Sequence, residues 1–414
     1  MKLIILTQYF PPEVGAPQNR LYEIAVRLRK MGVEIEVLTA MPSYPNSQIH
    51  PSYKGKWYVK ELMDEIPVHR SWIWVGKSKS ILSRLLNYFS FVFTSIWIGL
   101  FKLHKADFLF CESPPLFLGI SALVLKRAKR AKLIFNVADL WPKSAEELGL
   151  ITNRYLLKLS TYLENHLYRK AYIITGQTKG IVANIKARFP VKAVYWLPNG
   201  VDLSFYDPDL IASNWRSENN FSEDTFLILY AGILGYAQGL EIVLKAAEST
   251  AVFPNIKWLL MGDGPEKDKL AAMKYKVNLH NVNFFNTLPK NRMPAVWKSV
   301  DCALIPLRKL NLFKGSLPSK SFEAMAMERP LLLGVDGEAT ELFINDGKAG
   351  LNYIPDNASD LAEKAIYLFN NRDKAMTFGK NGREFVKTHF NRDTIALNFY
   401  NILNSNSPNA ASDS

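Results

Sequence analysis

The chain has 414 residues, of which 48% are hydrophobic and 21% are charged. This length suits two domains that each bury a core, and the composition excludes a disordered, collagen-like or disulfide-rich chain. The formal net charge of +13 predicts a polyanionic partner, which leaves nucleic acid, an anionic membrane or a phosphorylated substrate.

The cysteines and the first residues indicate the compartment. Cys111 and Cys302 lie far apart in the sequence and form no C-x-x-C motif, which fits a reducing compartment better than a disulfide scaffold. The opening residues, MKLIILTQYFPP, contain an apolar run that is too short for a signal peptide and lacks a small-residue cleavage site. We therefore expect a buried first strand and a cytoplasmic protein.

Short apolar strands alternate with helical segments through the first half of the chain. Strands are predicted at residues 2–9, 33–40, 107–112, 132–137 and 172–176, and helices at 17–31, 117–130 and 154–170. This alternation predicts a parallel sheet with helices on both faces. Residues 58–74 differ from it and predict an inserted β-hairpin.

Residues 85–103, LLNYFSFVFTSIWIGLFKL, carry no charge before Lys102 and are slightly short for a membrane span. Basic residues lie on both sides of this segment: Lys77, Lys79, Arg84, Lys126, Arg127, Lys129, Arg130 and Lys132. Such a pattern predicts a membrane-associating helix near 81–104 that lies in the interface. Burial in the core is the alternative, and the pattern alone does not separate the two.

The second half begins with a polar stretch at residues 204–222, which predicts an interdomain linker. The alternation then resumes, with strands at 226–233, 256–261, 282–285, 301–306 and 331–335. We expect an α/β protein of two doubly wound, Rossmann-like domains facing across a cleft. The predicted divisions are 1–205, 206–388, a C-terminal helix at 389–404 and a disordered tail at 405–414.

Ligands of such sheets bind at the loops that follow the strands. In FPPEVGAPQNR, Gly15 precedes a helix whose N-terminus would suit an anion, although a proline-rich turn explains this loop equally simply. In GDGPEK, Gly262 and Gly264 begin a G-x-G-x-x-G pattern whose third position is Lys267, so the dinucleotide fingerprint fails. A glycine turn that packs against a base or a sugar remains an alternative interpretation.

The third loop leads into LPSKSFEAMAMERP, residues 317–330. Ser319 and Lys320 lie at the start of a helix, where free N–H groups and the helix dipole favour an anion. Lys320 adds a full positive charge, and Glu323 could accept hydrogen bonds from a ribose, so the stretch predicts a grip for a nucleotide diphosphate. A capping box would need Ser or Thr at position 320, and an i,i+3 surface pair remains the alternative.

No metal or cofactor site is predicted. Asp207 and Asp209 form a D-x-D sequence in the expected linker, where a turn is the simpler interpretation. The histidines show no metal-ligand spacing, and no P-loop or H-E-x-x-H motif is present.

Together these segments resemble glycosyltransferase family four, particularly its members that build bacterial cell-surface polysaccharides. The resemblance covers nearly the whole chain and is carried by TQYFPPEVGAPQNRLYEIAVRLRKMGVEIEVLTA, NVADLWPKS, LPNGVD, YAGILGYAQGLEIVLKAA, MGDGPE and PSKSFEAMAMERP. It implies the GT-B fold, with an acceptor-binding N-terminal domain, a donor-binding C-terminal domain and a final helix that crosses back to the first. It also implies retaining transfer from a nucleotide sugar without an obligatory metal.

The chain departs from the family pattern at several positions. The first of two family glutamates falls on Gly315, and the family's Arg and Lys in the first loop of the second domain fall near Ile233 and on Gln238. Asp139, in DLWP, occupies the region of a family histidine. The resulting predictions are Lys320 and Asp139 as catalytic residues, and as donor-binding residues Gly15, Gln238, Gly262, Gly264, Ser319, Lys320 and Glu323.

The leading hypothesis is a retaining glycosyltransferase that moves an N-acetylhexosamine or a deoxy relative from a UDP-sugar to a lipid-diphosphate-linked glycan. It would work in surface-polysaccharide synthesis at the anionic cytoplasmic face of the membrane. A UDP-sugar 2-epimerase of the same fold and a sugar- or polyanion-binding protein are the alternatives. Nucleic-acid binding is disfavoured because the cations flank an apolar helix instead of alternating with exposed aromatics.

Overall fold

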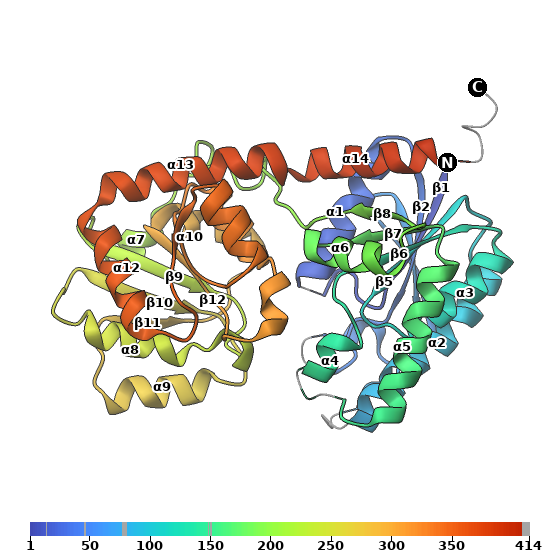
Figure 1. Cartoon of the computed structure of the whole chain (residues 1–414), viewed down its shortest axis with the longest axis horizontal. Coiled ribbons are helices and arrows are strands. Elements are labelled where there is room, and N and C mark those ends of the chain that lie inside the picture. Colours follow the sequence, from blue (N-terminus) through green and yellow to red (C-terminus); the bar gives the residue numbers. More distant parts are fainter. Residues whose placement is uncertain (14, 45–46, 77–80, 148, 150, 408–414) are drawn as a thin grey trace. The chain divides into compact units, whose positions relative to one another are not determined.

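The computed structural model describes residues 1–13, 15–44, 47–76, 81–147, 149 and 151–407. The chain forms two compact units: the first holds Met1–Asn199 and the segment from Arg392 onward, and the second holds Gly200–Asn391 (Figure 1). The first unit ends at Asn199, so the predicted division at 205/206 falls within the second unit. Lys77, Lys79 and residues 408–414 of the predicted tail lie outside the described residues, whereas Ser405, predicted to begin the tail, ends the last helix.

An eight-stranded sheet forms the centre of the first unit, in the order β3-β4-β2-β1-β5-β6-β7-β8. Its strands are β1 (Lys2–Leu6), β2 (Glu34–Ala40), β3 (Tyr58–Met63), β4 (Ile66–Ser71), β5 (Phe108–Ser113), β6 (Lys132–Val137), β7 (Ile173–Gly176) and β8 (Ala193–Trp196). The hairpin predicted as an insertion is part of this sheet, since β4 pairs parallel with β2 and β3 pairs antiparallel with β4 at the edge. The predicted hairpin is confirmed, and it extends the sheet at its edge because β4 is buried and pairs with β2.

Helices cover both faces of this sheet: α1 (Ala16–Lys30), α2 (Ile81–Lys102), α3 (Leu118–Ala128), α4 (Lys143–Glu147), α5 (Arg154–Lys170), α6 (Lys179–Arg188) and α14 (Arg392–Ser405). Strand side chains alternate between two cores. Leu109 and Phe135 join the core under α2, α3 and α5, whereas Phe110 and Ile134 join the core under α1 and α14 (Figure 1). The alternation predicted from the sequence therefore builds a layer of helices on each face.

The last helix, α14, packs on the first unit and not on the second, from which the chain enters it. The Phe399 ring lies 5.7 Å from the Phe110 ring, and Arg27 Nε donates to Asp393 Oδ1 at 2.6 Å. At the far end, Lys132 Nζ donates to the Asn406 carbonyl oxygen at 2.8 Å. The apolar face of α14 thus finds its partner in α1 and the edge of the first core.

The second unit has a six-stranded parallel sheet in the order β11-β10-β9-β12-β13-β14. Its strands are β9 (Phe226–Ala231), β10 (Ile256–Met261), β11 (Val282–Phe285), β12 (Cys302–Pro306), β13 (Leu331–Gly334) and β14 (Gly350–Asn352). Its α-helices are α7 (Trp215–Glu218), α8 (Glu241–Ser249), α9 (Lys267–Lys276), α10 (Met293–Ser299), α11 (Ser319–Ala326), α12 (Ala358–Asn370) and α13 (Arg372–His389). Edge strands β8 and β14 were not predicted, because strands this short carry little pattern.

The segment 204–222 is packed against the second unit and is not a free linker. Trp215 is 6% exposed, and its ring lies 5.2 Å from the Phe285 ring. Asp207 Oδ1 accepts from Asp209 N at 3.1 Å and from Arg383 Nη2 at 3.1 Å, so this D-x-D sequence forms the expected turn. The prediction of a linker is wrong because burial of the large aromatic side chain of Trp215 holds the segment against the second unit, although the residues around it are polar.

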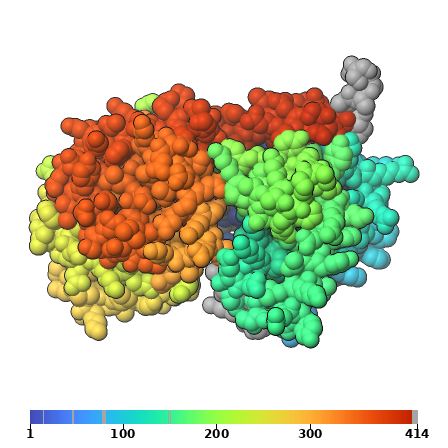
Figure 2. Space-filling model, in the orientation of Figure 1, coloured from blue at the N-terminus to red at the C-terminus, as the bar shows by residue number. Residues whose placement is uncertain are grey.

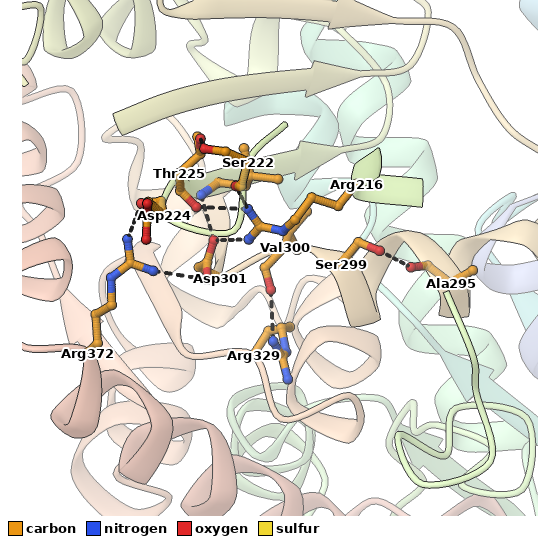
Figure 3. Close-up of polar contacts among 11 residues, drawn as sticks. Arg216, Ser222, Asp224, Thr225, Ala295, Ser299, Val300, Asp301, Arg329 and Arg372 are labelled. Carbon is orange, nitrogen blue, oxygen red and sulfur yellow. Dashed lines mark hydrogen bonds and ion pairs between the residues drawn. The ribbon is translucent and has the colours of Figure 1, made fainter. Parts of the chain in front are cut away.

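A charged cluster ties this segment to the amino ends of the strands (Figure 3). Asp301 Oδ2 accepts from Arg216 Nη2 at 2.8 Å and from Leu227 N at 2.7 Å. Arg372 Nη1 lies 3.8 Å from Asp301 Oδ1, and Arg329 Nη1 donates to the Val300 carbonyl oxygen. Because the cluster lies at the edge opposite the strand-end loops, it serves the fold and not the expected ligand site.

Candidate active site

Lys320 lies in the first turn of α11, which begins directly after Pro318. Pro318 has an extended backbone, and no side chain caps the helix. The first N–H groups of a helix have no intrahelical acceptor, and the dipole adds partial positive charge at this end. Ser319 is the first helical residue, and Glu323 follows on the next turn, both partly exposed. The predicted elements of an anion site therefore occur together in one uncapped helix start.

The Lys320 side chain reaches from α11 to the end of strand β9. Its Nζ lies 3.8 Å from the centre of the Tyr230 ring, beside Gly232. Burial lowers the pKa of Lys320 to about 7, although nearby Glu323 acts in the opposite direction. A bound anion would add a further negative charge close to this ammonium group.

Gly262 and Gly264 follow β10 and lie against the loop that follows β9. A Cβ atom on Gly262 would overlap the carbonyl oxygen of Gly232, and one on Gly264 would overlap that of Leu234. Both glycines also have positive φ angles. Close packing between neighbouring loops therefore explains why glycine is needed. Donor binding by these two residues stays a prediction.

Gln238 ends a short 3-10 turn (Tyr236–Gln238) in the loop after β9, and it is partly exposed. Arg308, which the sequence reasoning missed, fixes this loop from the end of β12. Its Nε donates to the Tyr236 carbonyl oxygen at 2.7 Å, and its Nη2 donates to Glu241 Oε1 at 3.0 Å. An arginine two residues after a buried strand was the available signal.

Gly15 and Asp139 belong to the first unit. Gly15 precedes α1 with φ 179°, an extended conformation that any residue adopts, so the backbone does not demand glycine there. Asp139 lies between β6 and α4 and is half-buried. Burial raises the pKa of its carboxyl group, while the Leu140 N–H acts to lower it. A carboxyl group with a raised pKa at a strand end suits proton or hydroxyl chemistry, and its catalytic role stays a prediction.

A buried polar chain that the sequence reasoning missed crosses the strand ends of the first unit. Arg20 Nη2 donates to Glu112 Oε1 at 2.5 Å, and Asn136 Nδ2 donates to Glu112 Oε2 at 2.6 Å. Thr175 Oγ1 continues the chain by donating to Asn136 Oδ1 at 2.7 Å. Arg20 and Glu112 are 2% and 3% exposed, so this ion pair is removed from water. A glutamate ending the otherwise apolar strand FLFCES was the available signal.

A cleft of about 930 Å³ opens where β2 and β4 end. Its lining is rich in aromatic and polar side chains, among them Glu13, Tyr44, His50, Lys54, Trp72 and Trp74. Glu13 Oε1 accepts from Ser43 N at 2.7 Å and from Tyr44 N at 2.8 Å, which holds the wall in place. This volume and this mixture of aromatic and polar groups suit a small organic ligand.

No group of three or more His, Cys, Asp or Glu side chains that could hold a metal occurs within the described residues. Asp207 of the D-x-D sequence pairs with Arg383.

Comparison with known proteins matches each unit to a domain family. The family described as "Glycosyl transferase 4-like domain" matches residues 15–200, and the family "Glycosyl transferases group 1" matches residues 212–385.

Two curated relatives and one solved structure illustrate the similarity. The chain is 26% identical over 334 residues to the colanic acid biosynthesis glycosyl transferase WcaI of Escherichia coli K12, covering 79% of this chain and 81% of WcaI. It is 25% identical over 263 residues to O-antigen chain mannosyltransferase C of E. coli, covering 61% of this chain and 66% of the mannosyltransferase. The structure of Anabaena HepE in complex with UDP-glucose aligns with a TM-score of 0.71 at 18% identity, covering 98% of this chain and 100% of HepE.

Proposed function

Because the chain belongs to glycosyltransferase family four and has the GT-B fold, we propose that it transfers a sugar from a nucleotide-diphosphate donor in surface-polysaccharide synthesis. Of the relatives, WcaI is described as acting in colanic acid biosynthesis and mannosyltransferase C as acting on an O-antigen chain. The donor would bind the second unit, and the acceptor would bind the first.

The observation that carries the donor site is the Lys320 ammonium group beside an uncapped helix start. A diphosphate brings two negative charges, and the free N–H groups of Ser319 and Lys320 offer donors of fixed direction. When the sugar leaves, negative charge builds on the departing phosphate. Donors that are already in place stabilise this charge without reorganisation, which is usually the largest catalytic contribution.

We propose a UDP-linked sugar as the donor, with Glu323 accepting hydrogen bonds from the ribose. The UDP-glucose held in the HepE structure supports this choice by analogy. The sugar would be an N-acetylhexosamine or a deoxy relative, transferred with retention and without an obligatory metal. We also propose Asp139, in the first unit, as a catalytic residue.

For the acceptor we propose a glycan on a lipid diphosphate, with its sugar in the cleft lined by Trp72 and Trp74. Aromatic faces pack on the apolar face of a sugar ring, and polar groups such as Glu13 accept hydrogen bonds from its hydroxyls. The cleft adjoins α2, because Asn87 Nδ2 donates to the Trp74 carbonyl oxygen at 2.7 Å. Trp74 N donates in turn to Ser90 Oγ at 2.9 Å. A lipid-borne acceptor and an apolar helix would thus lie in the same region of the first unit.

A thermal-shift panel tests the donor site, because a ligand that binds only the folded state raises the apparent stability. UDP, GDP, ADP and CMP would be compared on the wild type, on Lys320→Met and on Lys274→Met, a lysine on the exposed helix α9. We expect UDP to stabilise the wild type and the Lys274 variant, and to lose most of its effect on Lys320→Met. If GDP alone raised the melting temperature, the donor would be a GDP-sugar and not a UDP-sugar. If UDP stabilised Lys320→Met as much as the wild type, Lys320 would not be part of the donor site.

A 2-epimerase of the same fold is the second candidate. It would convert a UDP-sugar into its epimer without an acceptor, whereas a transferase releases UDP and needs one. Proton NMR of UDP-N-acetylglucosamine incubated with the enzyme alone separates the two. Accumulation of the 2-epimer would establish the epimerase.

A further inference from the structure

Helix α2 is apolar on two opposite faces. Its inner face belongs to the core, where Phe91 is 1% and Ile98 is 4% exposed. Its outer face carries a row of exposed apolar side chains, mostly three or four positions apart, which we term the α2 stripe: Leu82, Leu86, Phe89, Phe93, Trp97, Leu100 and Phe101. Residues at this spacing lie on one side of a helix. The core of the first unit therefore needs only half of the apolar surface that α2 presents.

The α2 stripe is continuous and strongly exposed: Phe93 is 64%, Trp97 54% and Phe101 67% accessible. Single exposed apolar residues are normal on a protein surface, whereas a contiguous row marks an interaction surface. Among the described helices, α2 is the one long and apolar enough to cross a membrane by length and composition. Its inner face argues against crossing, because Thr94 Oγ1 donates to the Trp72 carbonyl oxygen at 2.6 Å and lies 3.1 Å from Ser71 Oγ.

Helix α5 adds a second exposed row on the same side of the sheet. Tyr155 is 86%, Leu159 63% and Tyr162 63% exposed, at spacings of four and three. Helix α3 lies between the two, with Ser95 of α2 donating to Ser121 of α3 at 2.9 Å. The three helices lie together over the same core (Figure 1), and the space-filling view shows α5 at the surface of the first unit (Figure 2, green).

The charge of this layer has one sign. The basic side chains of α2, α3 and α5 are Arg84, Lys102, Lys126, Arg127, Arg154, Lys158, Arg169 and Lys170. Within these three described helices the one carboxylate is Glu164, which is buried and paired with Arg188 at 2.5 Å. The layer therefore presents apolar rows with cations around them and no exposed carboxylate of its own.

We propose that the α2 stripe docks the first unit on an anionic lipid bilayer, with α2 lying flat at the boundary between headgroups and acyl chains. Phe and Leu side chains enter the acyl region, Trp97 suits the interface, and cations at the helix ends contact anionic headgroups. A second copy of this chain is the less favoured occupant, since two such surfaces would bring cations against cations. The proposal concerns where the protein lies and does not rest on the transfer reaction.

Co-sedimentation with sucrose-loaded vesicles tests this proposal on the full chain. Vesicles of neutral phosphatidylcholine would be compared with vesicles containing about a third phosphatidylglycerol. We expect binding to the anionic vesicles that weakens with salt. The variant Phe93→Ser/Trp97→Ser should bind at least roughly tenfold more weakly, because two large apolar groups no longer enter the bilayer. The control Val252→Ser/Tyr275→Ser removes two side chains of the second unit that are even more exposed, and it should bind like the wild type.

The cations are tested separately with Arg84→Gln and Lys105→Gln, both at exposed positions beside the ends of α2. A basic residue near an anionic surface contributes about 1 kcal/mol, so each change should weaken binding to anionic vesicles about fivefold. Affinity for neutral vesicles should be unaffected by either change.

Brominated lipids report directly on Trp97, because bromine quenches a tryptophan that enters the acyl boundary. Part of the fluorescence of the wild type should be quenched on binding, and Trp97→Phe should lose that part while still binding. No binding to either vesicle, equal binding to both, or binding that survives Phe93→Ser/Trp97→Ser overturns the proposal. A dimer of the free protein that this double variant converts to monomer also overturns it and assigns the stripe to a second copy.

Discussion

The two units share a doubly wound architecture and differ in what they expose and where they place charge. In the first unit, α2 is apolar on its outer as well as its inner face. In the second unit, α13 buries Gly379, Gly382 and Val386 and turns Lys380 and Lys387 to solvent. One apolar face per helix is enough to cover a sheet. The second apolar face of α2 is therefore not required by the fold and is available for a partner.

Charge at the strand ends differs in the same way. The first unit buries Glu112 and supplies Arg20 and Asn136 as partners within the protein. The second unit places Lys320 Nζ 3.8 Å from the centre of the Tyr230 ring, with Glu323 as the carboxylate that acts on its charge. Loss of one partner from a buried ion pair is strongly destabilising, whereas a basic group at the start of a helix suits an anionic ligand.

The largest expected effect is on the buried pair of the first unit. Glu112→Ala leaves Arg20 charged and unpaired in the interior, which should lower the free energy of unfolding by about 3–5 kcal/mol. Urea unfolding, followed by circular dichroism and by the fluorescence of each unit's tryptophans, measures the change. The matched control is Glu384→Ala in the exposed Lys387–Glu384 pair of the second unit, which should cost under about 1 kcal/mol. Comparable costs for the two variants would contradict the contrast.

Lys320→Met should not lower the stability, unlike Glu112→Ala, and it should strongly lower the activity. Removal of a preorganised donor to the leaving phosphate should lower turnover by about two to three powers of ten, or roughly 3–4 kcal/mol. The free energy of unfolding should stay the same or increase by about 1 kcal/mol, because a desolvated ammonium group has been removed. The melting temperature should stay the same or rise accordingly. Kinetics and calorimetry on the same preparations measure both, with Lys274→Met as control. Near-normal turnover would show that Lys320 is structural.

The lowered pKa of Lys320 predicts a pH dependence of UDP binding. The ammonium form is present below pH 7 and is lost as the pH rises through about 7. The dissociation constant of UDP should therefore increase from pH 7 to 9, by at most about tenfold per unit. Lys320→Arg keeps its charge throughout this range and should show no such slope. Isothermal titration calorimetry measures the constants, and an equal slope in Lys320→Arg would assign the titration to another group.

The smallest expected effect concerns the stability of the α2 stripe. Phe93→Ser and Trp97→Ser should each change the free energy of unfolding by no more than about 0.5 kcal/mol, because both side chains are already in solvent. Phe91→Ala, on the inner face of the same helix, should cost about 3–5 kcal/mol. Thermal or urea unfolding without lipid compares the three. A large loss from Phe93→Ser would mean that the stripe is packed in solution.

The sequence alone determined most of the elements of both sheets. Strands β6, β10 and β11 and helix α5 begin and end where the hydrophobic pattern predicted, since these are regular segments bounded by turn residues. The grouping of Ser319, Lys320 and Glu323 at a helix start was also predicted, because sequence neighbours on a helix are neighbours in space. The predicted family was confirmed by the matches to both units.

Tertiary structure decided everything that depends on distant residues meeting. The partner of Lys320 is Tyr230, the partner of Glu112 is Arg20, and neither pairing leaves a trace in local spacing. The glycines after β10 are needed for a neighbouring loop and not for a nucleotide fingerprint. Whether α2 is a core helix or a surface helix was likewise undecidable from composition. Packing gave its inner face to the core and left its outer face to water, because burial is a property of what surrounds a side chain and not of the side chain itself.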